Sequence, residues 1–431
     1  MVTCRGPARA RRGRELAEVE VLRDAAVLVS DGRVAWVGPA RDAPAASATV
    51  EVAGVLFPGF VDCHTHAVFA APRVEDHERR ALGESYQAIA AAGGGILQSV
   101  RQVRECPEDA LYAVSAARVA MLLAHGTTTI EIKSGYGLDL EAERKQLRVI
   151  RRLSETLPLT VVPTFLGAHE VPPEYRPRRA EYVRLVCESM LPAVASEKLA
   201  RRCDVFCEPG VFTTAEARTI LQVARGLDLD TTMHADELEP SGGAELAAAL
   251  GARSADHLGA ISEPGITALA ATDTVAVLLP ATLAFLGRRV QAPARRMIDA
   301  GVAVALASDF NPGSSPTVGL PLVMSLAVSQ LGLRHAEALL AVTVNAAAAL
   351  GLAGDRGQIA PGFRADLVVA AVDHWREMAY WLGGNRVTAV WTGGSACRPH
   401  TGSLSLGSHV QARETPGSRQ ADGDARPQGR R

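Results

Sequence analysis

Short hydrophobic, β-branched runs alternate with Ala-, Leu- and Arg-rich stretches through the middle of the chain. The runs predict eight strands, at residues 60–66, 127–133, 159–166, 203–208, 230–234, 254–258, 274–279 and 302–308. The intervening stretches predict helices at residues 108–124, 141–156, 178–191, 214–226, 243–250, 264–271 and 290–300. Buried parallel strands joined by helical crossovers are typical of an α/β fold, and we expect a (β/α)8 TIM-like barrel. A doubly wound open sheet is the alternative, but no Gly-x-Gly-x-x-Gly fingerprint follows the first predicted strand.

The two ends of the chain carry a different pattern. Residues 27–38 form two β runs around Asp31-Gly32, which is a hairpin signal, and residues 357–369 and 387–394 again predict short strands and turns. Because a single hairpin is marginally stable alone, we expect both ends to build one small β domain. The predicted division is 1–57 and 356–399 for the two parts of this domain, 58–355 for the barrel, and 400–431 for a disordered tail poor in large apolar residues.

Composition and charge narrow the classes of function. The 431 residues are 48% hydrophobic and carry a net charge of −2, which gives no electrostatic case for a nucleic acid or an acidic membrane as a partner. The seven cysteines are scattered and predict no disulfide framework. No apolar run reaches the roughly 18 residues of a membrane span, and the Arg-rich N-terminus lacks the apolar region of a secretory signal. We therefore expect a cytoplasmic protein.

Imidazoles and a carboxylate recur where the predicted strands end. His64 and His66 are one residue apart at the end of the first strand, so their side chains project to the same side. Later strands lead to His169, His234, His257 and Asp309. One such residue alone is commonly structural, as a strand-end aspartate often caps the next helix. In a barrel, however, the carboxyl ends of all strands meet at one face, so the recurrence predicts a metal site there.

Longer motifs then carry a resemblance. Residues 58–66, followed by His234, His257 and Asp309, resemble the amidohydrolase superfamily, as does the segment 361–368. Within it, the chain resembles the imidazolonepropionase family over about residues 20–395, with matching blocks at 93–97, 126–129, 133–137, 167–169, 234–237, 254–258 and 309–316. The resemblance implies a composite β-sandwich beside the barrel. It also implies an activity: a metal-activated water hydrolyses the ring amide of 4-imidazolone-5-propanoate to N-formimidoyl-L-glutamate, in histidine degradation.

The resemblance further implies a role for each matching residue. One metal ion per subunit, Zn²⁺ or Fe³⁺, would be held by His64, His66, His234 and Asp309. Glu237 would transfer protons, His257 would polarise the carbonyl or the water, and Asp309 would also accept a proton. Substrate contacts would come from Arg73, Tyr136, His169, Glu237, Asn311, Gly313 and Ser314. Arg73 suits the propionate because a guanidinium binds a carboxylate with two hydrogen bonds, whereas Arg79 and Arg80 are assigned to solvent. Family members are commonly dimers, so a homodimer is possible.

Three other interpretations stay open at this point. Cyclic amidohydrolases such as hydantoinases and dihydroorotases bridge two metal ions with a carboxylated lysine, typically after the fourth strand. Lys133 follows the second predicted strand and the fourth ends at Glu208, which favours one metal. A deaminase would share the one-metal set but not the Lys133–Gly137 block. A non-catalytic relative that uses the barrel as an assembly scaffold would usually have lost metal ligands, and all of them are present here.

Overall fold

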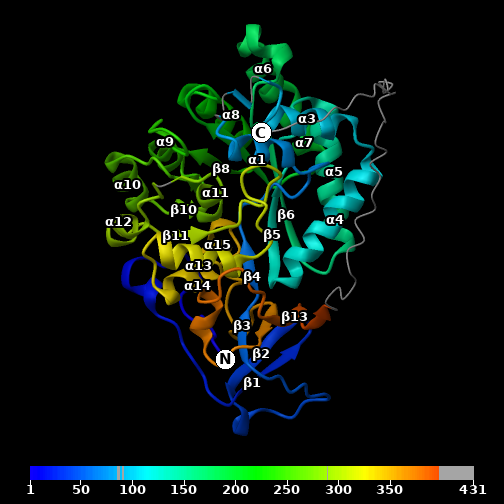
Figure 1. The fold of residues 1–431 in the computed structure, drawn as a ribbon. Helices are drawn as coiled ribbons and strands as arrows, with labels where there is room; N and C mark the ends of the chain where they lie inside the picture. Colours follow the sequence, from blue (N-terminus) through cyan, green and yellow to red (C-terminus); the bar gives the residue numbers. More distant parts are fainter. Residues whose placement is uncertain (85–87, 90–91, 289, 398–431) are drawn as a thin grey trace, which may run out of the picture. The chain divides into compact units, whose positions relative to one another are not determined.

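Eight parallel strands form a barrel at the centre of the molecule (Figure 1). The computed structural model describes residues 1–84, 88–89, 92–288 and 290–397. The barrel strands pair in sequence order as β4 (Phe60–Asp62), β5 (Thr127–Lys133), β6 (Thr160–Ala168), β7 (Arg202–Cys207), β8 (Asp230–Ala235), β9 (Ser254–His257), β10 (Val275–Leu278) and β11 (Val304–Leu306). A parallel bridge between Thr65 and Phe310 closes the ring just beyond β4 and β11. The predicted barrel is thereby confirmed, and the open sheet is excluded.

Helices surround the barrel. Those in or near predicted helical stretches are α4 (Glu108–Ala124), α5 (Leu140–Thr156), α6 (Arg179–Leu185), α7 (Leu191–Ser196), α8 (Thr214–Gly226), α9 (Gly243–Leu250), α10 (Glu263–Ala270) and α12 (Ala294–Asp299). One π-helical turn, Val186–Met190, joins α6 to α7. The helix predicted from residue 290 begins at Ala294, because Pro293 disfavours helical geometry in the residue before it. Not predicted were α1 (Val74–Ala81), α3 (Ile96–Glu105), α11 (Pro280–Phe285), α13 (Leu320–Gln330), α14 (His335–Ala341) and α15 (Val344–Ala349).

Local sequence explains where the predicted helices begin and which face they bury. Asp139 caps α5 by accepting a hydrogen bond from the amide of Ala142, and Thr213 and Glu216 form a capping box at the start of α8. Along α5, Leu147, Ile150 and Leu153 recur at helical spacing and are fully buried, while the opposite face carries arginines. Helix α5 therefore packs its apolar stripe onto the barrel.

The two chain ends share a second β layer, as predicted. Strand β3 (Val55–Pro58) pairs antiparallel with β12 (Leu367–Ala370), which continues to β13 (Val387–Thr392) and β14 (Ser395–Cys397). The hairpin of β1 (Ala25–Ser30) and β2 (Arg33–Pro39) turns at Asp31 and Gly32, whose φ angles of 50° and 76° suit such a tight turn. The amide of Val34 donates to the Phe363 carbonyl over 2.9 Å, which ties the hairpin to the C-terminal segment. In Figure 1 these first and last strands lie side by side below the barrel.

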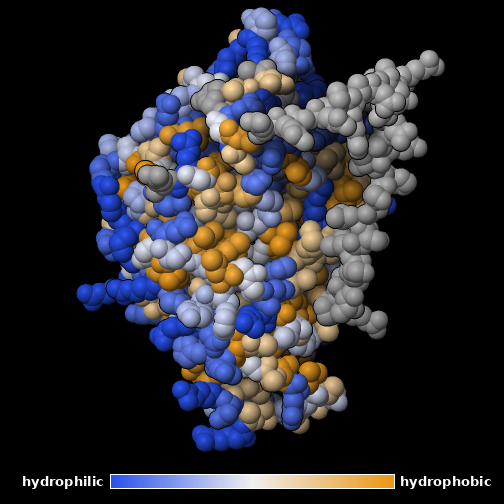
Figure 2. Space-filling model, viewed as in Figure 1, coloured by the Kyte–Doolittle hydropathy of each residue, from blue (hydrophilic) through white to orange (hydrophobic). Residues whose placement is uncertain are grey.

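The outer surface mixes polar and apolar residues over the face that Figure 2 displays. Among the helices described, none combines the length and hydrophobicity that crossing a bilayer requires. The tail predicted to be disordered, residues 400–431, lies outside the described residues.

Candidate active site

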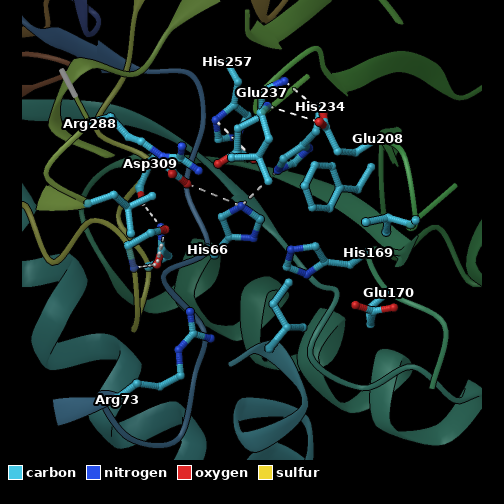
Figure 3. A pocket seen from close by; sticks show the side chains of 18 of the residues that line it. His66, Arg73, His169, Glu170, Glu208, His234, Glu237, His257, Arg288 and Asp309 are labelled. Carbon is cyan, nitrogen blue, oxygen red and sulfur yellow. Dashed lines mark hydrogen bonds and ion pairs between the residues drawn. The ribbon is translucent and has the colours of Figure 1, made fainter. Parts of the chain in front are cut away.

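Histidines and an aspartate meet at the carboxyl end of the barrel, where Figure 3 shows His66, His234, His257 and Asp309. Two overlapping groups have ligand atoms within 4.8 Å of one another: His64, His66 and Asp309, and His64, His234 and His257. His64 and His66 follow β4, His234 lies in β8, and Asp309 follows β11. The Nε2 atoms of His66 and His234 are 3.3 Å apart. Asp309 Oδ1 lies 3.6 Å from Nε2 of both His64 and His66. All four side chains are buried, so the structure brings together the residues that the sequence predicted as metal ligands.

These separations fit one metal ion. Two ligand atoms about 2.1 Å from a tetrahedral ion lie roughly 3.4 Å apart, close to the spacing found here. Nε2 of His64 is buried and has no hydrogen-bond partner in the part of the chain that the structure describes. Nε2 of His66 and Nε2 of His234 contact each other at 3.3 Å, and Asp309 Oδ1 lies 3.6 Å from Nε2 of His64 and of His66, so these ligand atoms converge. The chain therefore has a His/Asp cluster suited to a metal ion.

Burial and neighbouring charge favour the neutral, metal-binding form of two of the three imidazoles, His64 and His66. Burial, followed by the charge of Lys133, lowers the pKa of His64 well below its ordinary 6.5, and burial with His169 does the same for the pKa of His66. Burial opposes the charge of the third, His234, but the carboxylate of Asp204 outweighs burial and raises its pKa. Burial raises the pKa of Asp309 to about 6. Asp309 Oδ2 accepts a 2.6 Å hydrogen bond from Thr282, which leaves Oδ1 facing the histidines.

Carboxylates inside the barrel orient two of the imidazoles. Nδ1 of His64 hydrogen-bonds Asp256 Oδ2 at 2.6 Å, and Nδ1 of His234 lies 3.0 Å from Asp204 Oδ2. Holding Nδ1 turns Nε2 toward the cluster. Neither aspartate was predicted to have a role. The available signal was a charged residue inside a strand predicted to be buried, where unpaired carboxylates are rare.

Lys133 lies beneath the cluster. Its Nζ forms 2.8 Å ion pairs with Glu131 and with Asp204. Burial opposes the charge of Lys133, but Asp204 and Glu131 outweigh burial and raise its pKa. A lysine engaged in this way differs from the carboxylated lysine of two-metal enzymes, so the geometry favours one metal.

A cavity of about 750 Å³ opens above the cluster. Ten predicted site residues line it: His66, Arg73, Tyr136, His169, His234, Glu237, His257, Asp309, Asn311 and Ser314. Its lining also includes Arg80, Glu170, Phe206, Glu208 and Arg288, which sequence reasoning had not placed in the site. The assignment of Arg80 to solvent was wrong, because its guanidinium donates a 2.9 Å hydrogen bond to the Gly313 carbonyl and lies 5.4 Å from the centre of the Phe285 ring.

Glu237 projects into the cavity from the loop after β8 (Figure 3). Its Oε2 lies 3.6 Å from Nδ1 of His257. Burial and the charge of Asp309 raise the pKa of Glu237 to about 8. Glu208 accepts hydrogen bonds from the amides of Glu237, Leu238 and Glu239 at 3.0, 3.2 and 2.8 Å, and so fixes the loop. Glu208 therefore stabilises the loop that carries Glu237, a role that its position at a strand end did not indicate.

Arg73 enters the cavity from the opposite side (Figure 3). Its Nη1 donates to Ser99 over 3.1 Å, and its Nε lies 3.6 Å from Asp76. The guanidinium packs against Gly313 so closely that a Cβ at this position would overlap it. Asn311 shapes the same loop, since its Oδ1 accepts the amides of Gly313 and Ser314 at 2.9 and 2.7 Å.

Tyr136 and His169 stand beside the histidine cluster. The ring of His169 stacks on that of His66 with centroids 5.1 Å apart, and Tyr136 lies 5.9 Å from His66. Glu143, fully buried on α5, accepts the amides of Gly135, Gly137 and Leu138 at 3.0, 2.8 and 2.8 Å. One carboxylate therefore holds the Lys133–Gly137 segment in place.

Two residues of the site have unusual backbone conformations. His257 and Asp309 have φ angles of 77° and 50°, in the left-handed region that residues other than glycine rarely occupy. Such conformations persist where surrounding contacts enforce them, and they are common at functional sites. Both residues line the cavity.

Comparison with known proteins agrees with this barrel and its cluster. The model of the amidohydrolase family matches residues 55–397. The chain is 48% identical to imidazolonepropionase of Symbiobacterium thermophilum over 88% of this chain and 91% of that protein. It is 46% identical to imidazolonepropionase of Geobacillus kaustophilus, with the same two coverages. The fold and cluster are thus those of a metal-dependent hydrolase. The chain belongs to the amidohydrolase family and, within it, to the imidazolonepropionase family.

Solved structures show the same fold at much lower identity. The guanine deaminase of C. acetobutylicum superposes with a TM-score of 0.69 at 14% identity, covering 88% of this chain and 96% of that one. An adenosine deaminase from Xanthomonas campestris with bound zinc gives 0.65 at 21% identity, covering 88% and 89%. These likenesses concern the fold alone.

Proposed function

We propose that this chain hydrolyses the ring amide C–N bond of 4-imidazolone-5-propanoate to N-formimidoyl-L-glutamate, the third step of histidine degradation. One observation carries the proposal: a cluster suited to a metal, a carboxylate with a raised pKa and a buried arginine share one cavity. Relatives named imidazolonepropionase, 44–48% identical over about nine-tenths of the chain, support the choice of substrate. The same relatives favour this reaction over the deaminase alternative.

We assign the metal to His64, His66, His234 and Asp309. An ion in such a site supplies water activated at neutral pH and polarises a carbonyl oxygen. Glu237 takes a proton from the attacking water and returns it to the ring nitrogen, so that a C–O bond forms as the C–N bond breaks. A pKa of about 8 suits an acid–base group that works near neutral pH. His257, 3.6 Å from Glu237, polarises the substrate carbonyl or the water, and Asp309 is the second candidate proton acceptor.

Arg73 binds the propionate in this proposal. Its side chain is 7% exposed and is already oriented by Ser99 and Asp76, so it loses little conformational freedom when a carboxylate binds. Tyr136 and His169, on the same wall as His66, add hydrogen bonds to the ring or the carboxylate. Asn311 and Ser314 line the cavity, Gly313 lies between them, and the assignment of these three residues as substrate contacts stays a prediction.

Zinc and iron both suit a set of three histidines and one aspartate, and we propose one such ion per subunit. We further propose a cytoplasmic enzyme without a nucleic acid partner. The seven cysteines are all free, which supports a reducing compartment. A homodimer stays a prediction, which light scattering on the full chain would test.

The direct test follows the ultraviolet decay of freshly generated 4-imidazolone-5-propanoate with purified protein. The protein is assayed as isolated, after chelation, and after metal restoration. We expect metal-dependent decay above the spontaneous rate, with N-formimidoyl-L-glutamate as the product. A metal-loaded protein that leaves the spontaneous rate unchanged would refute the substrate assignment, and ammonia release would identify a deaminase instead.

A further inference from the structure

A buried group of charges lies directly beneath the histidine cluster. It consists of Lys133 and Glu131 on β5, Asp204 on β7 and Asp256 on β9. Lys133 Nζ lies 2.8 Å from Glu131 Oε1, 2.8 Å from Asp204 Oδ2 and 3.9 Å from Asp256 Oδ2. Its side chain is fully buried and does not line the cavity, so Lys133 cannot touch a substrate there.

Each of the three carboxylates also contacts the segment or side chain of a proposed metal ligand. Asp256 accepts from His64 Nδ1 over 2.6 Å. Asp204 Oδ2 lies 3.0 Å from His234 Nδ1, and its Oδ1 accepts the His234 amide at 3.1 Å. Glu131 Oε2 accepts the amide of Thr65, the residue between His64 and His66, at 3.2 Å. The ammonium group of Lys133 is therefore surrounded by three carboxylates, and each of them contacts a ligand histidine or the segment that carries one.

We propose that Lys133 is a positioning residue for the metal site, which keeps Glu131, Asp204 and Asp256 in the arrangement that presents the histidine Nε2 atoms to one ion. This inference rests on the proposed function only for the ligand assignment. Lys133 acts through the carboxylates, and it neither binds the metal nor bridges two metals.

Charge and burial explain why this position needs a cation. Without Lys133, three carboxylates would share an interior with little solvent, and their mutual repulsion would drive them apart. Any such movement turns the imidazoles that the carboxylates hold, because a metal ligand is aimed by the partner of its other ring nitrogen. Loss of such a partner typically weakens metal binding by 10- to 100-fold.

The test measures Co²⁺ binding to the metal-free full chain, by competition with a chromogenic chelator and by the visible spectrum. For Lys133→Met, which keeps length and removes charge, we expect Co²⁺ affinity to fall by about 10- to 100-fold and the visible bands to shift. Lys133→Arg, which keeps the charge, should recover part of the affinity. Lys145→Met is the matched control. That half-buried lysine donates to the carbonyls of Val103, Arg104 and Cys106 at 2.7, 3.1 and 2.9 Å, and its loss should leave Co²⁺ binding unchanged.

Wild-type affinity and spectrum in Lys133→Met would overturn the proposal. So would two bound ions per chain with a requirement for bicarbonate, which would make Lys133 a carboxylated bridge. If Lys133→Met does not fold, Asp256→Asn is measured instead, because it keeps the shape of the side chain and removes the charge that contacts both Lys133 and His64. Unchanged Co²⁺ affinity in Asp256→Asn would likewise overturn the proposal. Because no substrate is present, an error in the proposed reaction would not alter these outcomes.

Discussion

The floor and the rim of the cavity are held in different ways. The floor, which we define as His64, His66, His234 and Asp309, lies at the ends of barrel strands or just beyond them, and its residues are at most 3% exposed. Carboxylates within the barrel orient two of its imidazoles. The rim, which we define as Arg73, Glu237 and the loop 311–314, is held by contacts between loops, such as the amides that bind Glu208. Changes in the floor should therefore abolish the chemistry, whereas changes in the rim should affect single steps.

Removal of a floor ligand is expected to have the largest effect. His66→Ala deletes a nitrogen 3.3 Å from His234 Nε2 and 3.6 Å from Asp309 Oδ1. We expect loss of bound metal and a fall in kcat/KM of at least about 1,000-fold, because metal catalysis supplies several kcal/mol. Elemental analysis and turnover are measured on the same sample, with His374→Ala, an exposed histidine outside the cavity, as the control. A metal-free but active His66→Ala protein would contradict the ligand assignment.

A substitution of Glu237, in the rim, should lower turnover without affecting the metal that the floor binds. Glu237→Gln keeps the size of the side chain and removes its ability to carry a proton, so kcat should fall by about 100- to 10,000-fold while metal content stays at the wild-type level. Steady-state turnover gives kcat, and elemental analysis of the same sample gives the metal content. Glu239→Gln, two residues further along the same loop, is the control. Near-normal turnover in Glu237→Gln would remove its proton-transfer role.

The parts of the fold that sequence predicted well depend on local pattern. Strand β5 and helices α4, α8 and α9 have the predicted bounds, and local residues mark several of their ends. Pro107 precedes α4, a capping box begins α8, and Gly251 in the left-handed conformation ends α9. Helix α11 was missed because it is short and begins with Pro280 directly after β10. The domain boundaries at residues 57/58 and 355/356 stay predictions.

The candidate site divides in the same way. The floor could be predicted because His-x-His is a local motif and a barrel brings all strand ends to one face. The contacts of the rim could not, since they depend on loop conformation: nothing in the sequence places the guanidinium of Arg80 against Gly313, or Glu208 beneath the loop of Glu237. The roles assigned to the individual residues stay predictions until the variants are measured.

Substitution of Arg73 should have a smaller effect than the two changes above, and it should affect substrate binding rather than the chemical step. Arg73→Ala removes the proposed partner of the propionate, and a charged hydrogen-bonded contact contributes about 1.5–3 kcal/mol, so kcat/KM should fall by roughly 10- to 100-fold, mainly through KM. Saturation kinetics measure the split, and Arg79→Ala, whose half-exposed partner is Glu84, is the control.

Gly313 supplies an independent route to the same effect. A Cβ at this position would overlap the Arg73 guanidinium, so Gly313→Ala should displace that group without deleting it or touching the floor. We expect a rise in KM in the same direction as for Arg73→Ala, with wild-type metal content. The double variant should have a KM only slightly higher than that of Arg73→Ala alone, because both changes act on one contact.

Unchanged saturation kinetics in Arg73→Ala would assign the propionate to another cation of the cavity, and Arg288 and Arg80 would be the residues to substitute next. Additive losses in the double variant would instead mean that Gly313 contributes to binding separately from Arg73.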